Sequence, residues 1–236
     1  MDIRACLFDV FGTVVYWRTS VSRDLAAFAR QKGIDGIDWL EFAVEWRKLY
    51  QPAMDEVRSG RRAFTILDVL HRESLDKLIA RYRIQGLGES DLEHMNRVWH
   101  RLEPWPDVVE GLKRLKSKFV IAPCSNGNIA LMVNLAKRAG LPWDCILGAE
   151  TARAYKPMPE AYLTSCRQLG LAPGAVMMVA AHNHDLKAAK AQGLNTAFVA
   201  RPTEHGPGQT TDLTPDRSCV DVPARDFVEL AARLTS

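Results

Sequence analysis

From Pro104 to the C-terminus, segments typical of helices alternate with short apolar segments typical of strands. The strand-like segments are 119–124, 145–149, 176–180 and 195–199, and the helix-like segments are 107–117, 129–139, 159–169, 185–192 and about 224–234. Parallel strands need crossover helices between them, so this alternation predicts an α/β fold with a doubly wound, parallel sheet. An apolar run before Asp9 adds a further buried strand at the N-terminus.

Residues 16–101 separate that first strand from the others and contain no convincing strand pattern. Their apolar residues recur at spacings of three and four, which is typical of amphipathic helices, in the ranges 21–29, 39–54, 63–83 and 89–102. We therefore expect a core domain made of 1–15 and 102–236. Residues 16–101 would form a helical cap domain inserted above the strand ends.

The composition is that of an ordinary globular protein. The chain has 236 residues, of which 47% are hydrophobic and 25% are charged, and its net charge is +3. This charge and the absence of a Lys/Arg run argue against nucleic-acid binding, and no apolar stretch reaches membrane-spanning length. The first strand begins almost at once, so we expect no signal peptide. Five scattered cysteines without a C-x-x-C pair predict reduced thiols and a cytoplasmic location.

Polar residues follow the predicted strands at the sheet edge where open α/β sheets carry their chemistry. Asp9 ends the first strand, where a desolvated carboxylate must be paired or reactive. Taken alone, this pattern suits an ordinary strand-ending aspartate as well as a nucleophile. Ser125 and Asn126 follow the next strand, and they could cap a helix or help its free N–H groups to bind an anion.

Two further strand ends carry charged or titratable residues. Lys156 stands before a proline and is expected in a loop near the same edge, although a lone loop lysine is more often solvated surface. The strand 176–180 is followed closely by His182, Asn183, His184 and Asp185. Their spacing, with no matching histidine on another strand, favours a hydrogen-bonded cluster over a metal site.

Four of these motifs, taken in order, resemble those of the haloacid dehalogenase (HAD) superfamily. They are Asp9-Val10-Phe11-Gly12-Thr13, Ser125-Asn126-Gly127, Tyr155-Lys156-Pro157 and Asp185, and together they span nearly the whole chain. Phosphatases of the superfamily carry a second Asp where this chain has Phe11, and they tend to have paired acids where Asp185 stands alone. The chain therefore looks like the L-2-haloacid dehalogenase (type II) branch, with a Rossmann-like core, a helical cap, no metal and no cofactor.

The resemblance implies hydrolytic dehalogenation of small 2-haloalkanoic acids through an aspartyl ester, with inversion at C2. Asp9 would be the nucleophile, oriented by Thr13 and kept ionised by Lys156. Asp185, assisted by Lys156, would activate water. The implied substrate-binding residues are Ser125, Asn126, Phe11 and Tyr162. The implied halide-binding residues are Arg47, Asn126 and His184, and the alternative for Arg47 is a solvated helix arginine.

Several positions depart from the better-studied members. Ala180 and His182 stand where those members carry Ser and Asn, and His184 replaces an aromatic residue of the halide site. His182 or Asn183 would then orient the water, and histidines would suit a small, hard anion. The Gly-rich segment 201–213 neither leads from a strand into a helix nor carries a lysine, which favours a structural turn over a phosphate-binding loop.

Three alternatives remain at this point. The first is a related hydrolase that opens a strained cyclic imino acid such as azetidine-2-carboxylate; Tyr16 and Trp17 could line such a pocket or belong to the core. The second is a phosphatase, against which Phe11 argues, and the third is a catalytically inactive binding protein. The expected partners are a small 2-substituted carboxylic acid and the halide product, and a homodimer is compatible with the resemblance.

Overall fold

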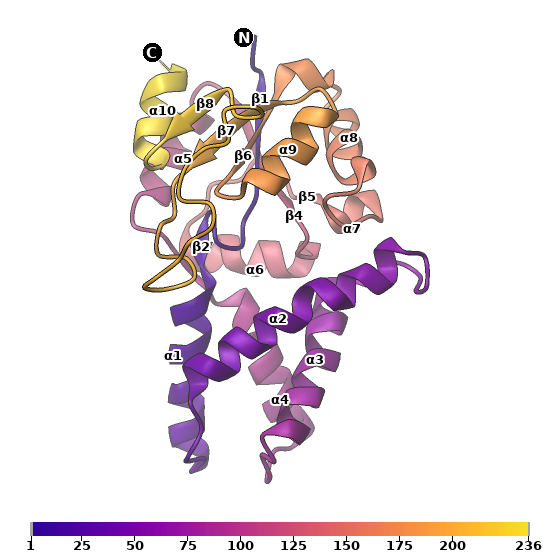
Figure 1. The fold of residues 1–236 in the computed structure, drawn as a ribbon, viewed down its shortest axis with the longest axis vertical. Coiled ribbons are helices and arrows are strands. Elements are labelled where there is room, and N and C mark those ends of the chain that lie inside the picture. The colour runs from indigo at the N-terminus through magenta and orange to yellow at the C-terminus, as the bar shows by residue number, and fades with distance from the viewer. Residues whose placement is uncertain (1, 236) are drawn as a thin grey trace.

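The computed structural model describes residues 2–235, which form an α/β part stacked on a helical part (Figure 1). The main sheet has six strands in the order β5-β4-β1-β6-β7-β8, and all neighbouring strands are parallel. The strands are β1 (Ala5–Phe8), β4 (Val120–Ser125), β5 (Leu147–Gly148), β6 (Val176–Ala180), β7 (Asn195–Val199) and β8 (Val222–Ala224). The predicted α/β fold with a parallel sheet is confirmed.

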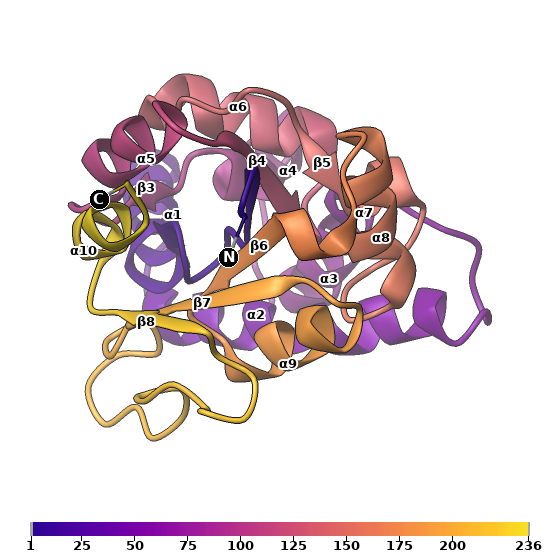
Figure 2. The same ribbon diagram turned by 90° about the horizontal axis from the view of Figure 1, so that it is seen from above.

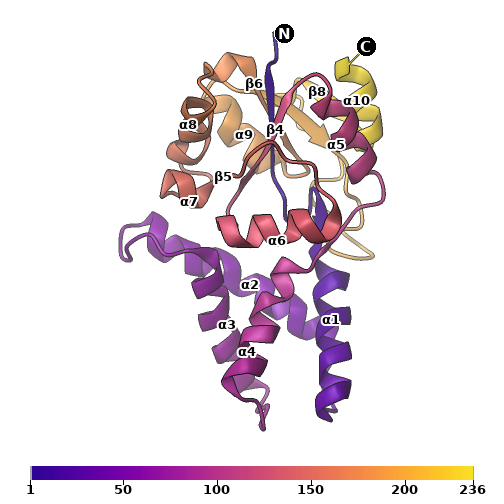
Figure 3. The same ribbon diagram turned by 180° about the vertical axis from the view of Figure 1, so that it is seen from behind.

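Helices cover both faces of the sheet, as Figures 2 and 3 show. They are α5 (Val108–Lys116), α6 (Ile129–Ala139), α7 (Ala149–Ala152), α8 (Pro159–Gln168), α9 (Asn183–Ala191) and α10 (Phe227–Thr235). Strand β1 is fully buried, and its side chains alternate between two hydrophobic clusters. Cys6 and Phe8 pack with the residues of α5, α6 and α10, whereas Leu7 packs with those of α8 and α9. A strand that is apolar on both faces is stable only where helices cover both sides of the sheet, and this explains why β1 lies inside the sheet between β4 and β6.

The helical part consists of α1 (Trp17–Lys32), α2 (Trp39–Arg58), α3 (Leu67–Arg81), α4 (Glu89–Asn96) and a 3₁₀ turn (Arg97–His100). Helix α2 lies across the end of the sheet, and the other helices extend away from it (Figure 1). The two chain crossings between the parts pair as a short antiparallel ladder, β2 (Val15–Tyr16) with β3 (Glu103–Pro104). No helix within residues 2–235 has the length and apolar character to cross a membrane.

A polar network joins the helical part to the α/β part. Asn128, at the start of α6, accepts a hydrogen bond from the backbone N–H of Asp68 (3.2 Å) and donates one to its carboxylate (2.9 Å). The other carboxylate oxygen of Asp68 lies 2.9 Å from Nε2 of His100, whose Nδ1 meets the Asn134 amide. These contacts hold α3 and the 3₁₀ turn on α6, and so they fix the helical part over the strand ends.

Some short elements differ from the sequence-based prediction. Strand β8 is absent from the sequence-based prediction. It contains Pro223, and a proline is tolerated there because β8 is an edge strand. Strand β5 is shorter than the predicted 145–149, since helix α7 begins at Ala149. The β2–β3 ladder, which includes Tyr16, was also not predicted, because two-residue strands carry no periodic signal.

The close packing of α5 against α10 gives a stability prediction. A Cβ atom on Gly111 would lie 2.4 Å from Cβ of Phe227, whereas a Cβ on Gly174 would meet nothing within 4 Å. We expect Gly111→Ala to destabilise the fold by about 1–3 kcal/mol through overpacking, although alanine is the better helix former. Gly174→Ala is the matched control, expected to be neutral or slightly stabilising. Urea unfolding of both variants checks this, and equal midpoints would contradict the packing argument.

Candidate active site

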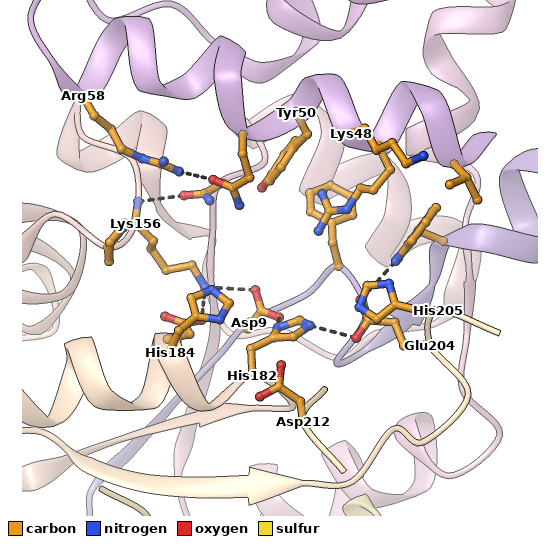
Figure 4. Close-up of a pocket in the computed structure, with 18 of the residues that line it drawn as sticks. Asp9, Lys48, Tyr50, Arg58, Lys156, His182, His184, Glu204, His205 and Asp212 are labelled. Atoms are coloured by element: carbon orange, nitrogen blue, oxygen red, sulfur yellow. Dashed lines mark hydrogen bonds and ion pairs between the residues drawn. The ribbon is translucent and has the colours of Figure 1, made fainter. Parts of the chain in front are cut away.

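A cavity of about 650 Å³ opens between the C-terminal ends of the strands and helix α2. Its core side is lined by Asp9 after β1, Asn126 after β4, Lys156 before α8, and His182 and Asp185 after β6. Helix α2 supplies Arg47, Lys48, Tyr50, Gln51 and Arg58. Figure 4 shows Asp9, Lys156 and His182 of the core side and Lys48, Tyr50 and Arg58 of α2 around the cavity. The parallel topology explains the convergence, because the carboxyl ends of all these strands lie at one edge of the sheet.

Asp9 is 7% exposed, and both of its carboxylate oxygens have partners. Nζ of Lys156 donates to Oδ1 at 2.9 Å, and the Thr13 hydroxyl donates to Oδ2 at 2.6 Å. Nδ1 of His182 lies 3.2 Å from the same Oδ2. Burial raises the pKa of Asp9, but Lys156, His182 and Thr13 outweigh it and hold this pKa well below the usual aspartate range. Asp9 is therefore a buried carboxylate that stays ionised.

Lys156 is the cation shared by two buried acids. Its ammonium donates to Asp9 and also to Oδ2 of Asp185, whose other oxygen accepts a hydrogen bond from the Tyr162 hydroxyl at 2.6 Å. Burial lowers the pKa of Lys156, but Asp185 and Asp9 raise it above its ordinary value. Burial and Asp185 raise the pKa of Tyr162, so Tyr162 remains a donor. The backbone N–H of Lys156 donates to Oδ1 of Asn126 at 2.8 Å, which fixes the loop.

His182 connects Asp9 to an acid that the sequence analysis did not identify. Its Nε2 lies 2.8 Å from Oε2 of Glu204, and Glu204 is only 3% exposed. Burial lowers the pKa of His182, but Glu204 and Asp9 raise it well above the ordinary histidine value. Glu204 belongs to the segment 201–213, which we call the tail loop. No spacing or periodicity in this segment marks Glu204 as a site residue.

The tail loop forms part of the cavity wall, a role that the sequence analysis did not assign to it. Glu204, His205 and Asp212 line the cavity, and the loop reaches toward the start of α1 (Figure 1). Arg201 anchors it, because its guanidinium donates to the Thr13 carbonyl (2.9 Å) and to both carboxylate oxygens of Asp107 (2.9 and 2.8 Å). The same arginine therefore supports the backbone of the Asp9 motif and the loop that carries Glu204.

Arg47 brings a positive charge to the cap side of the cavity. Its guanidinium carbon lies 4.0 Å from the ring centre of Tyr50, 5.6 Å from that of Trp17 and 5.9 Å from that of Phe11. One terminal nitrogen, Nη1, is buried without a hydrogen-bond partner among the described residues. A buried donor of this kind is costly unless something binds to it, so Arg47 is a candidate for binding an anion in the cavity that Asp9 also lines.

The other predicted site residues divide into two groups. Phe11, Asn126, Tyr162 and His184 line the cavity. The ring of His184 lies 5.6 Å from that of His182, and burial and His182 lower its pKa, so it is a neutral imidazole.

Ser125 and Asn183 lie outside the cavity lining, unlike their predicted placement. Ser125 is fully buried, and its hydroxyl accepts from the Gly127 N–H at 3.0 Å, so it shapes the turn below the site. The Asn183 amide donates to the Thr214 carbonyl and accepts from the Asp216 N–H, so it holds the chain after the tail loop and does not face a water in the cavity. Within residues 2–235, no group of three His, Cys, Asp or Glu side chains is arranged to hold a metal ion.

Comparison with known proteins agrees with this geometry. A family model described as haloacid dehalogenase-like hydrolase matches residues 3–193. The crystal structure of the defluorinating L-2-haloacid dehalogenase Rha0230 is 49% identical, with a TM-score of 0.96, over 99% of this chain and 96% of that chain. That of the L-2-haloacid dehalogenase PA0810 is 46% identical, with a TM-score of 0.92, over 98% and 99%. (S)-2-haloacid dehalogenase 4A from Burkholderia cepacia is 26% identical over 85% of this chain and 84% of its own length.

The buried Lys156 gives a prediction about stability and pH. Lys156→Met leaves Asp9 and Asp185 without their shared cation, so we expect a loss of about 3–5 kcal/mol at neutral pH. In the wild type the depressed pKa of Asp9 adds stability that is present at neutral pH and lost only as pH falls below the usual aspartate range. In the variant, Asp9 and Asp185 have lost the cation between them, and protonation of one carboxylate removes the repulsion. The loss of unfolding free energy relative to the wild type should therefore shrink as pH falls.

Urea unfolding at about pH 7 and about pH 5 measures both effects. Lys190→Met is the matched control, because Lys190 pairs with Asp221 at the surface, where its side chain is 39% exposed, and such a pair contributes about 1 kcal/mol or less. A Lys156→Met deficit no larger than that of Lys190→Met, or one that grows as pH falls, would contradict the assignment.

Proposed function

The chain belongs to the haloacid dehalogenase-like hydrolases, and we propose that it hydrolyses small 2-haloalkanoic acids to 2-hydroxy acids with release of halide. The observation that carries this proposal is that the pair of ionised Asp9 and Lys156 lines the same cavity as Arg47, which has a buried nitrogen without a partner among the described residues. A nucleophile and an anion site on opposite sides of one small cavity suit displacement of a leaving anion from carbon.

In the first step, Asp9 attacks C2 of the substrate and the carbon–halogen bond breaks. Negative charge moves from the carboxylate to the halogen, so a cation on the far side stabilises the transition state more than the bound substrate. Arg47 supplies that cation, and Asn126 and His184 add polar groups to the cavity wall. Attack opposite the leaving group inverts C2 and leaves an ester between Asp9 and the substrate.

In the second step, water attacks the ester carbonyl carbon of Asp9. Asp185 is the group that accepts the proton, because Lys156 and Tyr162 hold its carboxylate in place beside Asp9. The bond between this carbon and the ester oxygen on C2 then breaks, and that oxygen takes the proton from Asp185 and leaves in the 2-hydroxy acid. The Asp9 carboxyl group, which now carries the water oxygen, loses its proton to solvent and is a carboxylate again. Thr13 keeps the carboxylate oriented through both steps.

Phe11 separates this proposal from a phosphatase reaction. Its ring packs edge-on against Tyr50 and Trp99, with ring centres 6.4 and 6.0 Å apart, and forms an apolar wall beside Asp9. A phosphoryl-transfer site needs an acid or a metal to stabilise the leaving oxygen, and Phe11 supplies neither.

The free cysteines of the described structure support the further proposal of a reducing, cytoplasmic location.

We include fluoride among the halides released. Rha0230, which shares 49% of its sequence with this chain, is described as defluorinating. His184 brings a ring N–H to the cavity, and such a donor suits a small, hard anion better than a hydrocarbon ring does.

A halide-release screen tests the proposed function directly. The substrates are fluoro-, chloro- and bromoacetate and both enantiomers of 2-chloropropionate, assayed with EDTA present. We expect release from the haloacetates and from one enantiomer of 2-chloropropionate. Hydrolysis of a phosphate ester that depends on Mg²⁺, with no halide release from any haloacid, would overturn the proposal.

Replacing the nucleophile should abolish turnover. Asp9→Asn cannot form the ester, so we expect halide release to fall by at least about a thousandfold. Asp76→Asn makes the same chemical change on the exposed face of α3 and should leave the rate unchanged. Halide assays on both variants, with circular dichroism to verify the fold and mass spectrometry to verify the amide, measure this. A folded Asp9→Asn protein with substantial activity would remove Asp9 as the nucleophile.

Removing the proposed halide ligand should affect chemistry more than binding. We expect Arg47→Ala to lower kcat by about 10²–10³-fold with a smaller change in KM, since charge on the halide develops in the transition state. Arg81→Ala removes an arginine that is 62% exposed elsewhere on the helical part, and it serves as the control. If kcat of Arg47→Ala matches that of the control when chemistry limits the rate, Arg47 does not stabilise the leaving halide.

A further inference from the structure

We propose that Glu204 is a positioning residue that keeps His182 doubly protonated, so that His182 donates a hydrogen bond to the ester carbonyl oxygen of Asp9 and stabilises the oxyanion formed during ester hydrolysis. This inference rests on the proposed function, because it assigns a role within the second step of that reaction. The two residues concerned are His182, which stands where the better-studied members carry Asn, and Glu204 of the tail loop.

The protonation state follows from the partners of the two ring nitrogens. Nδ1 of His182 lies 3.2 Å from Oδ2 of Asp9, and Nε2 lies 2.8 Å from Oε2 of Glu204. Both partners are carboxylate oxygens, which only accept hydrogen bonds when ionised. A neutral imidazole would direct one lone pair at a carboxylate, whereas an imidazolium donates to both. Figure 4 shows His182 between these two acids.

The charges around His182 agree with this state. Glu204 and Asp9 raise its pKa, and the pKa of Glu204 is itself lowered by His182 against the effect of burial. Other titratable or charged groups near this pair are His184 and Asp185 on α9, Lys156 before α8, His205 and Asp212 in the tail loop, and Arg47 on α2. Asp9 and Glu204 contact the ring directly, so they determine its charge.

Glu204 is held in place by its surroundings. Its Oε1 accepts a hydrogen bond from Nε1 of Trp17 at 3.1 Å, which leaves Oε2 to face His182. Its carboxylate packs on Gly12, whose φ is +91° and where a Cβ atom would lie only 2.1 Å from Oε1. Glycine therefore meets two needs at this position, a positive φ and room for an acid. Arg201, three residues earlier, anchors the loop.

The two oxygens of Asp9 are not equivalent. Oδ2 accepts a hydrogen bond from the Thr13 hydroxyl and lies 3.2 Å from Nδ1 of His182, whereas Oδ1 accepts from Lys156 alone. The less occupied Oδ1 is the oxygen with a lone pair free for C2, so Oδ2 becomes the carbonyl oxygen of the ester. When water adds to the carbonyl carbon, negative charge develops on Oδ2. Thr13 and His182 then act as an oxyanion hole, with a full positive charge on one donor.

The step balances without a further reactant. The water oxygen bonds to the carbonyl carbon of Asp9, and its proton moves to Asp185. The tetrahedral intermediate then breaks its bond to the ester oxygen attached to C2, which takes the proton from Asp185 and leaves as the hydroxyl of the product. The second proton of the water, left on the Asp9 carboxyl group, is released to solvent, which restores the Asp9 carboxylate. His182 keeps both protons throughout, because its role is electrostatic.

Glu204→Gln tests the inference by separating the two chemical steps. The amide keeps the shape of Glu204 but removes the charge that holds the imidazolium. With chloroacetate in a rapid-quench assay, we expect a burst of chloride close to one per enzyme, followed by ester hydrolysis about 10–100-fold slower than in the wild type. Intact-protein mass spectrometry should show the ester accumulating. Glu110→Gln, at an exposed site on α5, is the control and should match the wild type.

The pH dependence of ester hydrolysis distinguishes an imidazolium that stabilises the oxyanion from a neutral His182 that acts as a general base. Without Glu204, the pKa of His182 should fall toward its ordinary value of about 6.5. If the imidazolium is the active form, hydrolysis in Glu204→Gln should slow as pH rises from about 6 to about 8, while the wild type changes little over that range. Glu204→Asp, which keeps the negative charge, should restore the wild-type profile.

Three results would overturn the inference. They are unchanged hydrolysis in Glu204→Gln, absence of the chloride burst in that variant, or a hydrolysis rate that rises with pH, which would make neutral His182 a general base. A wild-type enzyme that releases no halide from any haloacid would instead refute the proposed function, so the two failures are distinguishable.

Discussion

The site depends on one buried cation, the ammonium of Lys156 between the carboxylates of Asp9 and Asp185. Two acids at the end of a buried sheet would otherwise repel one another and take up protons. In the proposed reaction, Lys156 keeps Asp9 ionised for attack at carbon and holds Asp185 near the carbon that water must reach. The remaining charges follow the same logic, since His182 is balanced by Asp9 and Glu204, while Arg47 is left for a ligand.

The fold allows this charge balance because it joins distant parts of the chain. Parallel strands bring Asp9, Lys156 and Asp185 to one edge, and the polar network around Asp68 fixes the helical part over that edge. The tail loop closes a third side through Glu204. The charged groups therefore come from several elements, and the end of β6 supplies two of them, His182 and Asp185. Contacts outside the cavity, such as those of Arg201, anchor these elements.

The sheet and the residues at its edge were predictable from sequence, whereas the contacts made by loops were not. Strands and helices carry a periodic apolar pattern, and the topology rule then places Asp9, Lys156 and Asp185 together. Glu204 lies in a loop without periodicity, and only its tertiary contacts with His182 and Trp17 reveal it. The contacts of Asn183 were hidden for the same reason, because sequence position alone could not show that its amide turns toward residues 214–216.

The central claim is that Asp9 forms an ester whose carbonyl carbon is attacked by water. A single turnover in heavy-oxygen water, with enzyme in excess over haloacid, tests it most directly. We expect the heavy oxygen to appear in the Asp9 carboxylate, where peptide mass spectrometry finds it, while the first 2-hydroxy acid carries ordinary oxygen. Heavy oxygen in that first product, with Asp9 unlabelled, would show that water attacks C2 directly and that no Asp9 ester forms.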